Sequence, residues 1–132
     1  LTVLALMLAL YLTAPRAQEF CGMLDYFVEM APYFFEPIIM DGDGEFYEVS
    51  DWMPDADDCY FDAMDGSYWC VWEVGPSQER SYYINLGRAV RGCYPDWKVD
   101  NENGAAFIES DSIGIYISRE DGEVAISIEA FQ

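Results

Sequence analysis

Two runs of alternating apolar and polar residues stand near the C-terminal end of the chain, in the segment SIGIYISREDGEVAISIEAF. Alternation with a period of two is typical of strands with one buried face, and Asp-Gly between two such runs is typical of a tight hairpin turn. With Asp121 and Gly122 as the turn, Ile117 faces Val124 or Ile126. Five isoleucines then share one face, which must be buried against other elements: Ile113, Ile115, Ile117, Ile126 and Ile128.

A second hairpin is predicted upstream, where the runs CYFDAM and SYWCVWEV flank Asp65 and Gly66. The shorter runs DWKVD and AAFIE are further strand candidates. In the upstream hairpin the alternation places seven residues on one face: Cys59, Phe61, Ala63, Tyr68, Cys70, Trp72 and Val74.

Two segments show the spacing of amphipathic helices. The first carries apolar residues three or four positions apart and ends near Ala31, because Pro32 cannot continue a helix without losing a hydrogen bond. The second is GPSQERSYYINLGRAVRGC, with an expected start at Ser77, whose hydroxyl can cap free backbone amides, and an expected stop at Gly92. The apolar faces comprise Phe20, Leu24, Phe27 or Val28 and Ala31 in the first, and Tyr83, Leu86, Val90 and Cys93 in the second.

In chain order these elements are a helix, a strand, a hairpin, a second helix and two to four further strands. The predicted fold class is therefore α+β, with an antiparallel sheet of about five to seven strands, two helices packed on one face, and disulfide cross-links. The element order is similar to the architecture of bacterial secretion chaperones, although no sequence motif of that family is present. A likeness of architecture implies no function.

The N-terminal segment LTVLALMLALYLTAPRAQ is an apolar run followed by small residues, which is typical of a secretory signal peptide. We expect residues 1–17 to be this signal and residues 18–132 to form a single small α+β domain. The apolar run is shorter than the roughly 20 residues that a membrane-spanning helix needs. The expected location is secreted or periplasmic, with no membrane contact beyond the signal segment.

Four cysteines in an exported chain indicate two disulfides. If Asp65 and Gly66 form a two-residue turn, Cys59 lies opposite Trp72, and the two strand cysteines are too poorly placed to bond each other. Each would then pair with a helix, so the favoured pairing is Cys21–Cys59 and Cys70–Cys93. A four-residue loop, residues 63–66, would instead place Cys59 opposite Cys70 and leave Cys21 for Cys93.

Acidic residues are concentrated in the N-terminal half of the chain. Residues 18–79 hold 16 Asp and Glu and no Lys or Arg, whereas residues 80–132 hold nine acidic and five basic residues. Nucleic acid and anionic membrane surfaces are poor partners for such a chain, because phosphate contacts require clustered Lys and Arg.

The acidity peaks in residues 38–58, which contain eight carboxylates and no basic residue. One interpretation is a solvated turn in which aspartates favour the turn geometry. A second is a docking surface for a basic protein partner, inhibitor- or chaperone-like, because clustered negative charge steers a cationic protein and aromatic residues add contact energy. The candidate binding residues are Asp41, Asp43, Glu45, Asp51, Trp52, Asp55, Asp57 and Asp58.

A divalent-cation site, for calcium, is the alternative use of the same segment. Asp41, Asp43 and Glu45 alternate as the first ligands of an oxygen-ligand loop do, but an EF-hand that starts at Asp41 needs Gly where Phe46 stands and an acid where Trp52 stands. This pattern still allows a calcium site with less regular ligand spacing.

Catalysis has few candidate groups in this sequence. Histidine is absent, which excludes Ser-His, Cys-His and histidine-metal chemistry, and no P-loop or dinucleotide motif occurs. Paired carboxylates can hydrolyse glycosides, so a small carboxylate-dependent hydrolase is a second alternative. We expect a non-enzymatic binding protein that requires no cofactor.

Overall fold

The computed structural model describes residues 14–131, and these form two α-helices and eight strands. Helix α2 (Ala14–Met30) leads through two short 3-10 turns, η1 (Ala31–Tyr33) and η2 (Glu36–Ile38), into the first strand, and helix α3 (Glu79–Cys93) separates the fourth strand from the fifth. The strands are β1 (Ile39–Gly42), β2 (Phe46–Val49), β3 (Asp58–Asp62), β4 (Ser67–Glu73), β5 (Lys98–Glu102), β6 (Ala105–Glu109), β7 (Ile113–Glu120) and β8 (Glu123–Ala130).

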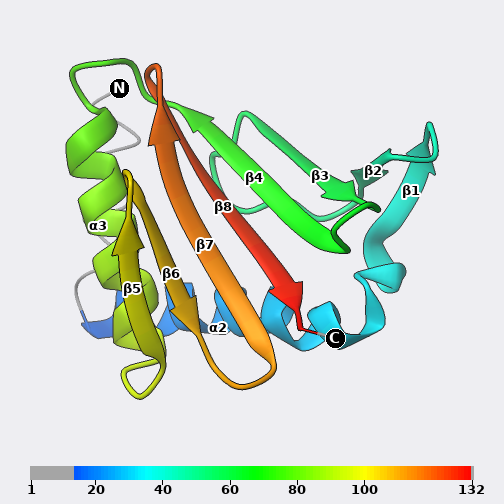
Figure 1. Ribbon diagram of the computed structural model, residues 1–132, viewed down its shortest axis with the longest axis horizontal. Helices are drawn as coiled ribbons and strands as arrows, with labels where there is room; N and C mark the ends of the chain where they lie inside the picture. Colours follow the sequence, from blue (N-terminus) through cyan, green and yellow to red (C-terminus); the bar gives the residue numbers. More distant parts are fainter. Residues whose placement is uncertain (1–13, 132) are drawn as a thin grey trace.

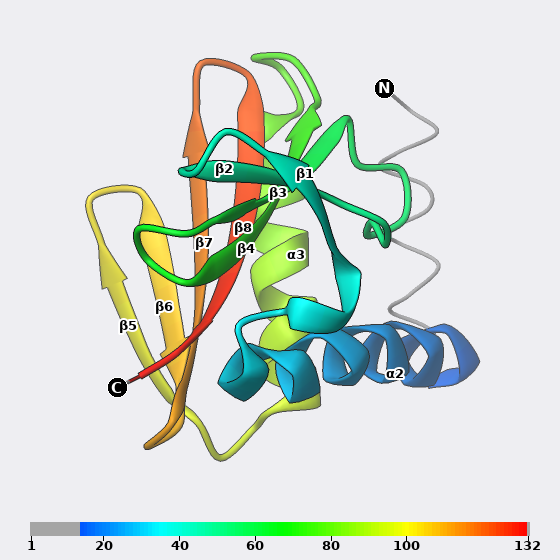
Figure 2. The ribbon, with the colours of Figure 1, turned by 90° about the vertical axis from the view of Figure 1, so that its right-hand side faces the viewer.

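All eight strands belong to one antiparallel sheet, in the order β1-β2-β3-β4-β8-β7-β6-β5. Both helices lie on one side of this sheet (Figures 1 and 2). We call that side the covered face, and the opposite side, which is turned toward the reader in Figure 1, the open face. The predicted α+β class is confirmed. The sheet has eight strands rather than five to seven, because residues 39–49 form two short strands where one was expected.

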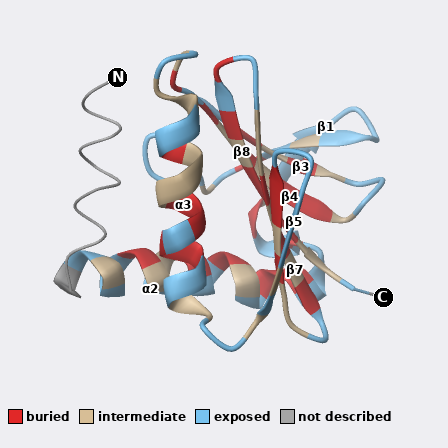
Figure 3. Ribbon diagram, turned by 60° about the vertical axis from the view of Figure 1, so that its left-hand side comes forward, coloured by how far each residue is buried: buried red, intermediate tan, exposed pale blue. Residues whose placement is uncertain are grey.

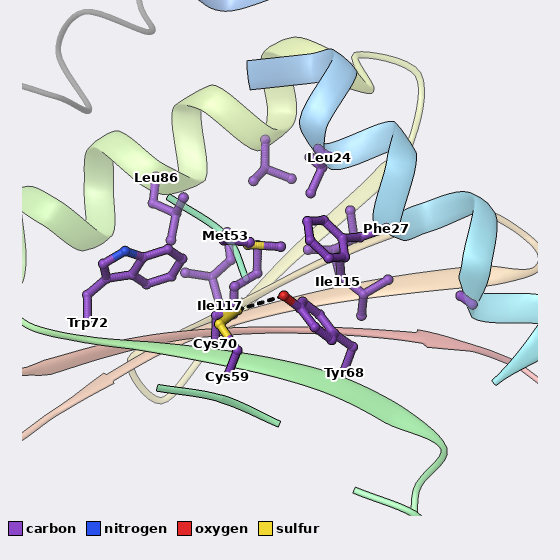
Figure 4. Packing of buried hydrophobic residues seen from close by; sticks show 14 of the residues in the cluster. Leu24, Phe27, Met53, Cys59, Tyr68, Cys70, Trp72, Leu86, Ile115 and Ile117 are labelled. Atoms are coloured by element: carbon purple, nitrogen blue, oxygen red, sulfur yellow. Dashed lines mark hydrogen bonds between the residues drawn. A yellow bond between two sulfur atoms is a disulfide. The ribbon is translucent and has the colours of Figure 1, made fainter. Parts of the chain in front are cut away.

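The core lies between the covered face and the helices (Figure 3). All five isoleucines predicted to share a face are buried there, and Ile117 lies opposite Ile126. Leu24 and Phe27 of α2 and Leu86 of α3 pack against this layer (Figure 4). Removing apolar side chains from water on this scale is the main favourable term in folding.

The helix boundaries follow the predicted signals in part. Helix α2 ends at Met30, just before Pro32, and its first residues fall within the predicted signal peptide, most of which lies outside the described residues. Helix α3 begins at Glu79 rather than at Ser77, and no side chain caps it; the amides of Gln78 and Glu79 donate instead to the carbonyl of Gly75.

The two predicted hairpins differ in their turns. Strands β7 and β8 are joined by Asp121 and Gly122 alone, as predicted. Strands β3 and β4 are joined by the four residues 63–66, so the prediction of a two-residue turn was wrong. The Asp62 carboxylate accepts a hydrogen bond from the amide of Met64 at 2.9 Å, and this side-chain turn ends the strand pairing at Asp62 and Ser67.

The register between β3 and β4 determines which cysteines pair. Cys59 lies directly opposite Cys70, with 4.1 Å between the Cα atoms, and the two are bonded within the core (Figure 4). The second disulfide joins Cys21 of α2 to Cys93, the last residue of α3. The favoured pairing of Cys21 with Cys59 and of Cys70 with Cys93 was therefore wrong, and the alternative pairing is the one observed.

Two disulfides indicate that the protein resides in an oxidising compartment. Within residues 14–131, neither helix combines the length and the apolar character that crossing a membrane requires.

Candidate binding site on the open face

The open face carries a row of aromatic side chains, where an antiparallel sheet facing water usually presents polar ones. Each neighbouring pair of rings has centroids 4.7 to 6.3 Å apart, and Ser127 of β8 occupies the gap between Trp69 and Tyr116. The row thus spans most of the sheet. Its members are Phe46 on β2, Tyr60 on β3, Trp69 on β4, Tyr116 on β7 and Phe107 on β6.

A cleft of about 380 Å³ opens beside the middle of this row. Its floor contains three residues with small or absent side chains, Ser67, Gly114 and Ser127, and its walls are aromatic. Small residues between large neighbours on one sheet face leave a hollow, because cross-strand neighbours on a face lie only about 5 Å apart. The aromatic walls are Trp69, Phe107, Tyr116 and Phe131.

Three carboxylates border the cleft: Asp65, Glu109 and Glu129. Glu109 on β6 and Glu129 on β8 both lie opposite Gly114 on β7, so one stands on each side of the glycine. Asp65 belongs to the four-residue turn between β3 and β4. Burial, with a contribution from the neighbouring Asp65 charge, raises the pKa of Glu129. The surroundings of the cleft therefore disfavour the charged form of Glu129.

The open face as a whole is strongly acidic. Of the basic residues, Arg16, Arg80, Arg88 and Arg91 lie on the helices, and Arg119 contacts Glu79 of α3, so Lys98 is the one basic residue that the described strands place on this face. The Lys98 ammonium lies 3.6 Å from the Asp100 carboxylate. The alternation of the strands places ten carboxylates there: Glu48, Asp58, Asp62, Glu73, Asp100, Glu102, Glu109, Glu120, Glu123 and Glu129.

The predicted site residues are divided between different parts of the fold. Asp41 lies on the edge strand β1, and Asp43 and Glu45 lie in the turn between β1 and β2. The amides of Phe46 and Glu45 donate to the Asp43 carboxylate at 2.8 and 2.9 Å, and these hydrogen bonds lower the pKa of Asp43. Asp43 therefore stabilises the turn, as one of the predicted interpretations proposed.

Residues 50–57 form a loop that packs toward the helices. The Asp51 carboxylate accepts a hydrogen bond from Tyr26 of α2, and its carbonyl accepts one from the buried Tyr68 at 2.9 Å. Trp52 is 48% exposed and donates to the carbonyl of Val49, and Asp55 is exposed beyond it. The Asp57 carboxylate accepts the amide of Glu73 at 2.6 Å. Asp58 is the one predicted site residue on the open face.

The structure thus does not gather the predicted residues into one site. Within residues 14–131, no three Asp, Glu, Cys or His side chains are placed to hold a metal ion together, so the geometry gives the calcium alternative no support.

The residues of the cleft did not enter the predicted site. Their signal was present in the strand patterns: Tyr116 alternates with the isoleucines of β7, and Trp69 alternates with buried residues of β4. Aromatic residues at the outward positions of a strand indicate a contact surface, because those positions are ordinarily polar.

No protein-family model, no curated protein and no solved structure matches this chain.

Proposed function

We propose that this protein is a secreted or periplasmic binding protein, not an enzyme, that docks a basic protein partner on the open face of its sheet, in the manner of an inhibitor or chaperone. The observation that supports this most is the aromatic row set among ten carboxylates and one lysine. Aromatic side chains dominate the energy of protein interfaces, and complementary charge speeds encounter and excludes wrong partners.

The charge of the open face supports a basic partner. An acidic or nucleic-acid partner would meet like charge over most of the face, which costs free energy at every contact. The two disulfides support an oxidising compartment, and the predicted signal peptide supports export as the route to it.

The experiment compares two charge-neutralised variants that lose the same number of carboxylates. The open-face variant carries Glu48→Gln, Asp58→Asn and Glu123→Gln; the control carries Asp41→Asn, Glu45→Gln and Asp55→Asn, which lie outside the open face. Immobilised wild-type protein is used to capture a partner from envelope and culture extracts at about 50 mM salt, and the purified partner is then titrated against all three proteins.

We expect a partner with a basic isoelectric point, released as salt is raised, and about ten-fold weaker binding by the open-face variant than by the control. If the control variant loses affinity and the open-face variant does not, docking occurs through the predicted segment of residues 41–58 instead. Failure to capture any basic protein, or capture that salt does not reverse, contradicts the proposed function.

One observation favours a second candidate, a small carboxylate-dependent hydrolase. Glu109 and Glu129 flank the cleft from strands two spacings apart, which is about 9–10 Å between backbones, and the pKa of Glu129 is raised by burial, as in a general acid. A pair of this kind suits inverting glycoside hydrolysis. Turnover of a chromogenic oligosaccharide that is lost in Glu129→Gln would establish this candidate.

A further inference from the structure

We propose that the cleft beside the aromatic row receives the guanidinium group of one arginine side chain of the basic partner. This inference rests on the proposed docking function and names the contact at its centre.

The orientation of the rings favours an enclosed cation over a flat ligand. The ring of Tyr116 stands at 70° to that of Trp69 and at 53° to that of Phe107, with centroids 6.1 and 4.7 Å away. At these distances the three rings touch one another and form one continuous wall of the cleft whose faces point in different directions, whereas a sugar-binding platform presents ring faces in a common plane. A cation within about 6 Å of an aromatic centroid is attracted to the ring face, and the planar guanidinium stacks on it as well.

The indole of Trp69 is fixed for this role. Its Nε1 donates to the hydroxyl of Ser67 in the floor of the cleft at 2.8 Å, so the polar edge of the ring is satisfied inside the protein. The ring is half-buried, and it lines the cleft together with Tyr116.

The carboxylates supply the acceptors that a guanidinium needs. Glu109 and Glu129 stand on opposite sides of Gly114, and Asp65 approaches from the turn between β3 and β4. A guanidinium presents five donors in a fixed planar fork, so it can bond carboxylates on two sides at once, whereas a lysine ammonium offers a point charge. No residue that lines the cleft is basic, and Lys98, which lies opposite Glu109, pairs with Asp100.

The volume is sufficient for one arginine side chain. A cleft of about 380 Å³ stands near the lower end of the roughly 300–1,000 Å³ that small-ligand sites occupy. The ring of Phe131 closes one end, since a Cβ built on Gly114 would lie 2.6 Å from its Cζ. Gly114 therefore leaves room for the ring of Phe131, and a larger side chain there would displace this ring from the cleft without changing any charge.

The test uses N-acetylarginine amide, with N-acetylcitrulline amide as the uncharged analogue of the same shape and N-acetyllysine amide as the point charge. Binding is followed by the amide shifts of Gly114, Tyr116 and Ser127 in NMR spectra. We expect saturable shifts with the arginine compound, about ten-fold weaker binding of citrulline, and intermediate binding of lysine. Arginine binding should weaken as pH falls and Glu129, whose pKa is raised by burial, becomes protonated.

Three variants separate the cleft from the rest of the open face. Glu109→Gln with Glu129→Gln neutralises two of the three carboxylates, Gly114→Val displaces the ring of Phe131 from the cleft while every charge remains, and Glu48→Gln with Glu123→Gln is the control on the same face. The first two should lose at least about ten-fold in affinity for the arginine compound and for the captured partner, and the control should lose less. Thermal melts confirm that each variant folds.

Equal binding of citrulline and arginine, or unchanged binding by the Gly114→Val protein, would overturn the inference. Shifts of the same amides by a neutral oligosaccharide, in the absence of any shift by arginine, would overturn it in favour of a glycan site. A captured partner that binds both cleft variants normally contradicts the arginine site and leaves the docking function intact. Absence of any captured partner contradicts the docking function instead.

Discussion

The two halves of the described chain have the same order of elements but are stabilised in different ways. Helix α2 precedes the four strands β1 to β4, and helix α3 precedes the four strands β5 to β8. Each set of strands runs in sequence order, and the halves join where β4 pairs with β8. The first half is acidic and aromatic, whereas the second holds five basic residues and the five isoleucines that were predicted to share a face.

The difference is sharpest in the central row of the covered face. There Cys70 of β4 lies opposite Ile126 of β8. Toward β3, Cys70 is bonded to Cys59. Toward β7, Ile126 packs against Ile117. Corresponding positions of two similar hairpins are thus held by a covalent bond in one half and by buried methyl groups in the other. A hairpin with few branched aliphatic residues gains most from a cross-link.

The largest expected effect comes from separating the helices of the two halves. Cys21→Ala with Cys93→Ala removes a link across 72 residues, and we expect the free energy of unfolding to fall by about 4 kcal/mol. The corresponding change at Cys59 and Cys70, which are 11 residues apart, should cost about 3 kcal/mol by the same entropic argument. Guanidinium chloride unfolding measures both. A larger loss at the Cys59–Cys70 pair would show that packing, not chain entropy, governs these bonds.

The next effect concerns the isoleucine pair that replaces the cross-link in the second half. Ile117→Ala leaves a cavity in a fully buried position, and we expect a loss of about 3 kcal/mol. Tyr116→Ala, one residue along the same strand but on the open face, is the matched control and should cost clearly less, because its ring is half-buried. Equal losses would mean that the open face is as important to folding as the covered one.

A smaller effect separates the two hairpin turns. Gly122 and Gly66 both have positive φ, at 83° and 68°, which disfavours any other residue. A Cβ at Gly122 would meet the backbone of Gly75 at 3.3 Å, whereas one at Gly66 would meet the exposed ring of Phe34 at 3.1 Å. The backbone of Gly75 cannot move aside to make room for a new Cβ, whereas the exposed ring of Phe34 can. We expect Gly122→Ala to cost about 2 kcal/mol and Gly66→Ala about 1 kcal/mol in unfolding experiments.

The smallest effect lies where the acidic turn of the first half approaches the second half. Burial and the Asp65 charge raise the pKa of Glu129 above its ordinary value, so the folded protein binds this proton more tightly than the unfolded chain does. Protonated Glu129 stabilises the folded protein at pH values below the ordinary glutamate pKa of 4.5, and this stabilisation is lost as pH rises through the pKa of Glu129 in the folded protein. Glu129→Gln should therefore stabilise the protein slightly at pH 7, and the gain should vanish near pH 3. A variant less stable than wild type at pH 7 would contradict this sign.

The sequence pattern predicted the fold class because both hairpins and both helices bury one face with a regular period. It failed at the first hairpin, where Asp65-Gly66 resembles Asp121-Gly122. There the Asp62 side chain bonds the amide of Met64 and starts the turn early, which shifts the register and exchanges the disulfide partners. A competing side-chain hydrogen bond of this kind leaves no trace in the alternation.

The candidate site was less predictable for a different reason. Clustered acids in residues 41–58 are conspicuous in the sequence, yet Asp43, Asp51 and Asp57 serve local hydrogen bonds. The cleft is assembled from β4, β6, β7, β8 and the turn at Asp65, and its two sides meet through the pairing of β4 with β8, which are distant in sequence. Once the strand order is known, the outward aromatic positions identify it.

The Cys59–Cys70 bond has a consequence for the surface on the other side of the sheet. Tyr60 and Trp69 adjoin these cysteines in sequence and face one another on the opposite side, so the sulfur atoms fix the alignment of two rings that they never touch. Without this bond, sliding of β3 by a single residue would turn Tyr60 inward. The oxidation state of the interior is thereby transmitted to the exterior, because the disulfide fixes the register that aligns the two rings.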